Sequence, residues 1–296
     1  MGSIHDGVDL IASLGCEIGE NPLWHRDEQK LFFVDISPGI IYAYDPAKAS
    51  CSVFNRTRVT GGFTFQQDGS LLLFQDGPIA ILTLDGTLRQ VVTGKCPGNE
   101  RFNDVIADPE GRVFAGAMGG NGTLWRFDPD GAVIKIAEGF GCPNGMGFTP
   151  DLRGMYFTDS PARTIYYFDY ERKTGNLSNR RTFAEIPVNE GLPDGMTVDA
   201  EGYVWTALWF GGRVKRYAPD GSLDREILLP VNQISSITFG GADLTDIYIT
   251  STSSTTADLL RHPSCEAVGA RGGGLYRARA PGICGTVPFR SRINFS

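Results

Sequence analysis

Hydrophobic and polar positions along the chain alternate in short runs that are typical of β-strands. Segments such as KLFFVDI, SLLLF, RVFAGAM, GMYFTD, YVWTAL and DIYITS are rich in β-branched and aromatic residues, and Gly, Asp and Pro lie between them. A second strand that ends in a turn follows most of these segments, for example IIYAYDP, TLWRFDPDG and RVKRYAPDG. Long helical periodicity is hard to find. The pattern therefore predicts an all-β protein.

The strands recur in six units, and one residue near the start of each unit serves as its anchor. The anchors are separated by 41 or 42 residues, except for one interval of 50 that contains an insertion, and they are Glu20, Gly62, Asn103, Asn144, Asp194 and Ser235. A period of about 40 to 50 residues with four short strands is typical of a β-propeller blade. A β-sandwich also has short strands, but it has no reason to keep a fixed period. We therefore predict one six-bladed β-propeller domain over residues 1–296.

Composition and charge exclude several function classes. Of the 296 residues, 41% are hydrophobic and 21% are charged, which is typical of a folded, water-soluble protein. The net charge of −7 argues against a nucleic-acid partner. No apolar run approaches the roughly 18 residues that a membrane helix needs, and the N-terminus does not resemble a secretory signal. We expect a cytoplasmic monomer that binds neither nucleic acid nor a membrane.

The six cysteines are scattered and form no C-x-x-C pair. In a large cytosolic domain this favours reduced, mostly buried thiols over disulfides. Cys265 and Cys284 flank a Gly-rich stretch and are the pair to check for a disulfide. Cys16 and Cys142 precede two of the anchors, so they either narrow a pocket there or act as small hydrophobic residues in the core.

The anchors indicate where chemistry could occur. The first strands of propeller blades line a central channel, so their starts converge at one end of it. Glu20, Asn103, Asn144 and Asp194 would bring carboxylate and amide oxygens together there, and hard divalent cations prefer such ligands. Asn and Asp before Gly are also common turn residues, but four in register favour an axial metal site. The sequence does not fix the ion among Ca²⁺, Zn²⁺, Mn²⁺, Mg²⁺ and Fe²⁺.

Two further features could contribute to such a site. Arg101 lies two residues before Asn103 and could bind a hydroxyl-rich substrate or a developing oxyanion, or it could instead pair with Asp104. Three aromatic side chains near strand starts could form an apolar wall against a sugar ring or belong to the core, and they are Trp24, Trp209 and Phe210.

The motifs GENPLW, RFNDV, PNGM, PDGM and WTALWFGGRV resemble those of the gluconolactonase and senescence marker protein (regucalcin) family. The resemblance runs from about Gly15 to Tyr276. It implies a six-bladed propeller that hydrolyses a sugar lactone such as gluconolactone with one bound divalent metal. The metal ligands that it implies are Glu20, Asn144 and Asp194, and the substrate contacts are Arg101 and Asn103.

One departure from the family pattern concerns the sugar. Animal members carry a Glu shortly after an AGTM-like segment, whereas the matching region here reads GGNG. Asn121 is the nearest candidate for this substrate contact. An amide can hydrogen-bond a hydroxyl but brings no charge, so the preferred lactone stays open.

The resulting hypothesis is that the metal polarises the lactone carbonyl while Asp194 acts as the general base. Two alternatives remain. The first is a metal-dependent propeller hydrolase of another ester or of a phosphotriester. The second is a non-enzymatic calcium-binding propeller, which would bind metal without metal-dependent turnover.

Overall fold

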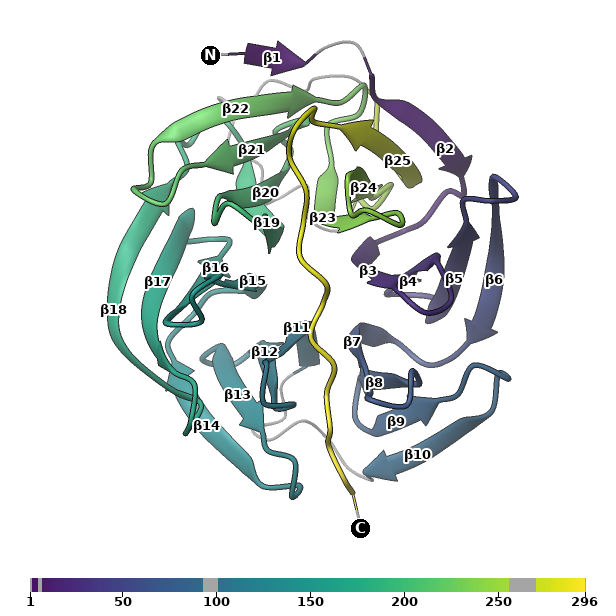
Figure 1. Cartoon of the computed structure of the whole chain (residues 1–296), viewed down its shortest axis with the longest axis vertical. Helices are drawn as coiled ribbons and strands as arrows, with labels where there is room; N and C mark the ends of the chain where they lie inside the picture. Colours follow the sequence, from purple (N-terminus) through teal and green to yellow (C-terminus); the bar gives the residue numbers. More distant parts are fainter. Residues whose placement is uncertain (1, 5–6, 93–100, 256–269, 296) are drawn as a thin grey trace.

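Six sheets of mainly antiparallel strands stand around a central axis, each with the strand that carries its anchor residue innermost (Figure 1). The structure is a computed structural model that describes residues 2–4, 7–92, 101–255 and 270–295. The predicted all-β, six-bladed propeller is confirmed. Among the described residues there is no helix with the length and apolar character needed to cross a membrane.

In each of the first three blades, the four strands follow chain order from the inside of the propeller to its rim. Blade 1 consists of β3 (Gly19–His25), β4 (Lys30–Asp35), β5 (Ile40–Asp45) and β6 (Ser50–Arg56). Blade 2 consists of β7 (Thr60–Phe65), β8 (Leu71–Gln75), β9 (Ile79–Leu82) and β10 (Leu88–Val92). Blade 3 consists of β11 (Arg101–Ala107), β12 (Val113–Met118), β13 (Thr123–Phe127) and β14 (Val133–Glu138).

Blades 4 to 6 complete the ring. Blade 4 consists of β15 (Pro143–Phe148), β16 (Gly154–Asp159), β17 (Thr164–Glu171) and β18 (Asn176–Glu185). Blade 5 consists of β19 (Leu192–Val198), β20 (Val204–Trp209), β21 (Arg213–Tyr217) and β22 (Leu223–Leu228), with β1 (Gly2–Ile4) parallel to β22. Blade 6 consists of β23 (Ile234–Gly240), β24 (Asp246–Ser251), β25 (Gly274–Arg279) and β2 (Asp9–Ser13).

The irregular anchor interval and the closure of the ring both have a structural origin. The 50-residue interval contains the longest strands of the described chain, β17 with 8 residues and β18 with 10. The ring closes because β2, from the N-terminal region, pairs antiparallel with β25 and becomes the outer strand of the last blade. The repeat pattern predicted the blades but not this exchange of a strand between the two ends of the chain.

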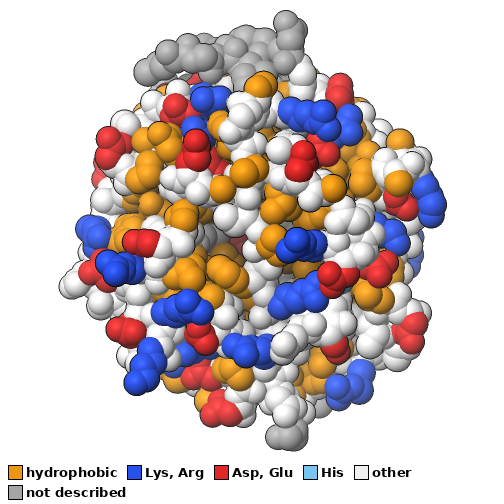
Figure 2. Space-filling view, in the orientation of Figure 1, with side chains coloured by type: hydrophobic (Ala, Val, Ile, Leu, Met, Phe, Trp, Pro, Cys, Tyr) orange, Lys and Arg blue, Asp and Glu red, His pale blue; other side chains and the backbone are white. Residues whose placement is uncertain are grey.

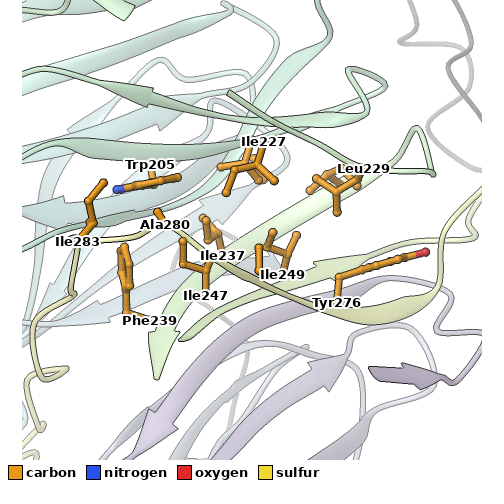
Figure 3. Packing of buried hydrophobic residues seen from close by; sticks show 14 of the residues in the cluster. Trp205, Ile227, Leu229, Ile237, Phe239, Ile247, Ile249, Tyr276, Ala280 and Ile283 are labelled. Carbon is orange, nitrogen blue, oxygen red and sulfur yellow. The ribbon is translucent and has the colours of Figure 1, made fainter. Parts of the chain in front are cut away.

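The hydrophobic core lies between neighbouring blades, where the two sheet faces pack against each other. The seam between blades 5 and 6 is an example: Trp205 and Ile227 of blade 5 pack with Phe239, Ile247 and Ile249 of blade 6 (Figure 3). Because strands in the middle of a blade are covered on both faces, they read as nearly continuous apolar runs, such as LLLF and VFAGA in the sequence.

A C-terminal segment, residues 280–295, crosses one end of the central channel (Figure 1). It is held by backbone hydrogen bonds to the last residues of the inner strands and to the turns that follow them. Ser291 N donates to Phe65 O at 2.7 Å, and Arg292 N donates to Gly111 O at 2.8 Å. Since these turns lie at the far ends of the inner strands, the segment covers the end of the channel opposite the anchors.

Candidate active site

Each anchor residue lies at the second or third position of an inner strand, next to an irregularity in the strand pairing. The register shifts directly after Glu20, Asn144 and Ile234, and similar shifts lie between Thr60 and Gly62, Phe102 and Val105, and Pro193 and Met196. An extra residue in a strand bends it and redirects a side chain. The same local feature in all six blades therefore turns the anchor positions towards the axis.

Glycines beside the anchors allow the inner strands to approach one another at the axis. A Cβ atom at Gly145 would lie 2.5 Å from both Asp194 O and Met196 N of the neighbouring strand β19. A Cβ atom at Gly195 would clash with Ser236 Oγ of β23. The Gly of the PNGM and PDGM motifs, at positions 145 and 195, is therefore required for close approach between neighbouring blades.

A cavity of about 290 Å³ opens where the inner strands start. Five of the six predicted site residues line it: Glu20, Arg101, Asn103, Asn144 and Asp194. They come from blades 1, 3, 4 and 5, so residues far apart in sequence meet in one site. Asn121 does not line this cavity. It is exposed in the turn between β12 and β13, and its side chain interacts with Glu138 of β14.

The Asp194 carboxylate is buried and incompletely satisfied. The residue is 3% exposed, and its Oδ1 atom has no hydrogen-bond partner. Burial raises the pKa of Asp194 well above its usual value, and the charges of Glu20 and Asp104 raise it further. A buried carboxylate oxygen without a partner is costly unless a cation or a proton compensates it.

Glu20 and Asn144 complete an oxygen-rich group around the axis. The Glu20 Oε2 atom accepts a hydrogen bond from the backbone N–H of Asn21 at 3.0 Å, and burial raises the pKa of Glu20. Asn144 donates its Nδ2–H to Ser160 Oγ at 3.2 Å, which leaves its amide oxygen as a possible ligand.

The donor set bears on which metal could fit. Within the described part of the chain, no three His, Cys, Asp or Glu side chains form a group able to hold a metal by themselves. A metal site here would need the amide oxygen of Asn144 and the unpartnered Asp194 oxygen, and these donors fit a hard divalent cation.

Arg101 is held at the cavity wall by its neighbours and does not pair with Asp104. Its guanidinium donates to Phe102 O at 2.9 Å and to Asn103 Oδ1 at 3.1 Å. Asn103 is fixed in turn, because its Nδ2 donates to Pro143 O at 3.0 Å. The two residues therefore form a preorganised unit that spans blades 3 and 4.

Some cavity residues escaped the reasoning from the sequence. The ends of the second strands also face the cavity, which adds Ile36, Met118 and Ser160 to Trp209, which the sequence suggests for an apolar wall. In an antiparallel hairpin the end of the second strand lies beside the start of the first, as in the pairing of Arg101 with Met118. The repeat also contains the end of each second strand, so the same hairpin geometry predicts that these strand ends lie around the cavity.

The aromatic residues and cysteines that the sequence placed near strand starts have different environments, and Trp209 and Phe210 lie at the end of β20 instead. Trp209 lines the cavity, whereas Trp24 is buried and stacks on Tyr248 with ring centroids 5.9 Å apart. Phe210 is buried against Trp209. Cys142 lines the cavity, and Cys16 is a buried core residue. The described cysteines, Cys16, Cys51, Cys142 and Cys284, are free thiols, and Cys265 lies outside the described residues.

A second, inner cavity of about 380 Å³ lies on the other side of the carboxylates, towards the C-terminal segment. Asn21 and Asp104 line it, and Thr286 to Phe289 of the C-terminal segment form part of its wall. Figure 2 views this face of the molecule, with charged side chains of both signs spread across it and a hollow near its centre. The inner cavity contains none of the predicted ligands.

Asn21 connects three blades at the axis. Its backbone has a positive φ of 49°, its Oδ1 accepts a hydrogen bond from Phe63 N of blade 2 at 2.7 Å, and its side chain hydrogen-bonds Asp104 of blade 3. We expect Asn21→Ala to lower the free energy of unfolding by about 1–3 kcal/mol, because it loses both bonds and strains the backbone. Urea denaturation would measure this loss.

Asn21→Gly is the matched control, because glycine tolerates the positive φ but also lacks the amide. The difference between the two variants isolates the backbone strain. Wild-type stability of Asn21→Ala would contradict this role of Asn21.

Comparison with known proteins agrees with the propeller architecture. The family described as "SMP-30/Gluconolactonase/LRE-like region" matches residues 18–253. Pentonolactonase XacC of Haloferax volcanii is 41% identical over 289 residues, covering 97% of this chain and 98% of that protein. Regucalcin of Xenopus laevis is 32% identical, covering 95% and 97%.

A crystal structure of a calcium-binding protein, regucalcin, from Agrobacterium tumefaciens superimposes with a TM-score of 0.87. It is 21% identical to this chain and covers 99% of it and 100% of its own length, so it supports the fold alone. The family match spans most of the chain and includes the five residues that meet in the cavity. The chain therefore belongs to the SMP-30/Gluconolactonase/LRE-like family.

Proposed function

We propose that this protein hydrolyses a sugar lactone to the corresponding aldonic acid with one bound divalent metal ion. The observation that carries the proposal is the buried, unpartnered Oδ1 of Asp194 in a cavity that also contains Glu20, Asn144, Arg101 and Asn103. Membership of a family with a pentonolactonase at 41% identity supports the substrate class.

Glu20, Asn144 and Asp194 would hold the ion. When bound, a divalent ion in such a site supplies positive charge that polarises an ester carbonyl and favours ionisation of water. Three protein side chains leave room for substrate in the coordination sphere of most divalent cations. Because Asn144 is a neutral amide, the three ligands carry a total charge of −2, which balances a dication.

The residues of this chain would then move protons and hold charge. Asp194 accepts a proton from the water that attacks the carbonyl carbon. The Arg101 guanidinium, fixed by Asn103, donates hydrogen bonds to the oxygen that becomes negative. The ring C–O bond breaks next, and the leaving oxygen takes up the proton from Asp194. Water is thereby added across the ester bond, which gives a carboxylic acid and a hydroxyl group on one open chain.

The remaining partner predictions belong to the same proposal. The substrate is a small molecule, and we propose a cytoplasmic monomer without a nucleic-acid or membrane partner. The net charge of −7 supports the absence of nucleic-acid binding.

Metal removal and restoration test the proposal. We expect chelated protein to lose turnover of glucono-1,5-lactone and of pentono-1,4-lactones, and one or more of Ca²⁺, Zn²⁺, Mn²⁺, Mg²⁺ and Fe²⁺ to restore it. The restoring ion should also stabilise the fold by about 2.7 kcal/mol at a concentration 100 times its dissociation constant. Thermal unfolding measures this binding without reference to activity.

Three outcomes would contradict the proposal in different ways. Full lactone turnover in chelated protein would exclude a requirement for the metal in hydrolysis. Faster turnover of phenyl esters or paraoxon than of any sugar lactone would favour the alternative hydrolase. Metal-dependent stabilisation without turnover of any substrate would favour the non-enzymatic calcium-binding alternative.

A further inference from the structure

The cavity wall around the predicted ligands is largely apolar. Its hydrocarbon and thioether side chains come from blades 1, 3, 4 and 5, and they are Ile18, Ile36, Met118, Pro161, Leu192 and Trp209. Blades 1 and 5, which supply the carboxylates Glu20 and Asp194, contribute four of these six. Apolar side chains therefore lie beside the two carboxylates on the cavity wall, and the hydrogen bonds that each carboxylate accepts come from neighbouring residues of the inner strands.

Trp209 presents carbon rather than its N–H group to this cavity. Its indole Nε1 has no hydrogen-bond partner and is shielded from solvent. The residue as a whole is half-buried and lines the cavity, so its accessible surface belongs to the ring carbons. Such a surface packs against C–H groups and cannot satisfy a hydroxyl.

The polar side chains of the wall are largely occupied within the protein. Three of the five N–H groups of Arg101 point to Phe102 O, Asn103 Oδ1 and Met118 Sδ. The Asn103 amide oxygen accepts a hydrogen bond from Arg101, and its Nδ2 donates one to a backbone carbonyl. Ser160 Oγ accepts a hydrogen bond from Asn144. Apart from the predicted metal ligands and the thiol of Cys142, two N–H groups of Arg101 and the hydroxyl of Ser160 are the lining groups left for substrate hydroxyls among the described residues.

From this balance we infer that the preferred substrate is a deoxy sugar lactone, whose terminal carbon is a methyl group where hexonolactones carry a hydroxymethyl group. The inference rests on the proposed lactonase function and specifies its substrate class. The lactone ester and its nearest hydroxyls face the ligands and Arg101, and the methyl group packs on the wall formed by Leu192 and Trp209. A terminal hydroxyl at that wall loses its water and gains no partner, which opposes binding in the transition state.

A pair of substrates that differ by one oxygen atom tests the inference. L-Rhamnono-1,4-lactone and L-mannono-1,4-lactone are identical except that the first lacks the hydroxyl on C6. We expect kcat/KM to be about 10 to 100 times higher for the rhamnonolactone, the range over which apolar pockets discriminate between such groups. Equal values, or a preference for the mannonolactone, would overturn the inference.

The result also separates this inference from the proposed function. Turnover of both lactones without preference overturns the deoxy-sugar inference and leaves the lactonase proposal standing. No turnover of these lactones, of gluconolactone or of pentonolactones with any of the five metal ions overturns both.

A variant examines the wall directly. Leu192→Asn keeps the branched shape of the side chain and adds an amide to the cavity wall, so we expect it to reduce the preference for the rhamnonolactone at least threefold. Leu10→Asn, the same change at a residue of the outer strand β2 that is 53% exposed, is the control and should leave the preference unchanged. An unchanged preference in folded Leu192→Asn would contradict the assignment of the methyl group to this wall. Should Leu192→Asn fail to fold, the wild-type substrate pair still decides the inference.

Discussion

Replacement of Asp194 by Asn is expected to lower lactone turnover by about 10²–10⁴-fold at saturating metal, the range associated with loss of a general base. The variant keeps an oxygen at the position of the predicted ligand but cannot accept the proton of the attacking water. Initial rates with gluconolactone, measured over a series of metal concentrations, would separate loss of the base from loss of metal. Near wild-type kcat would exclude Asp194 as the base.

A charge-swapped double variant is the matched control for this prediction. Asn144→Asp combined with Asp194→Asn preserves two carboxylates and one amide among the predicted ligands but moves the carboxylate from blade 5 to blade 4. We expect metal to stabilise this variant in thermal unfolding while turnover stays low. Recovery of turnover in the double variant would mean that ligand charge, rather than the location of the base, limits the reaction.

The second large effect concerns stability. We expect Gly145→Ala to reduce the free energy of unfolding by about 3 kcal/mol or more, because the new Cβ would lie 2.5 Å from backbone atoms of β19. Backbone cannot move aside as a flexible side chain can, so strands β15 and β19 must separate. Urea denaturation measures this loss.

Gly282→Ala provides the comparison, because Gly282 has a positive φ of 80° but no neighbouring atom within 4 Å of the added Cβ. This control should lose only about 1 kcal/mol, from backbone strain alone. If both variants lost the same free energy of unfolding, close packing of the inner strands would not explain the glycine of the PNGM motif.

The blades and the residues of the axial cavity were predictable from the sequence because both depend on one periodic signal. Hydrophobic alternation marks the strands, and a fixed interval brings equivalent positions around one axis. Glu20, Asn144 and Asp194 could therefore be grouped before any coordinates were known, and the structure brings them to one cavity. Their roles as ligands and base stay predictions.

Other features depend on geometry that periodicity does not encode. The register shift beside each anchor has no residue signature of its own, although the glycines at 145 and 195 are consistent with it. The position of Asn121 in its motif predicts a substrate contact, but the turn between β12 and β13 directs its side chain towards Glu138 rather than the cavity. Blade 6, which is built from both ends of the chain, cannot be predicted from the repeat, because β2 is far in sequence from the other three strands of that blade.

That shared blade has a consequence for how the protein folds. Asp9 pairs with Arg277, so the ring cannot close until nearly the whole chain has been synthesised. Blades 1 to 4 could form earlier from local hairpins, whereas closure joins the most distant segments of the sequence. Such non-local pairing is slow, since the entropy of bringing the ends together is lost before the contacts form. Once the ring is closed, blade 6 can leave it only by breaking both of its seams and the pairing of β2 with β25, which favours slow unfolding.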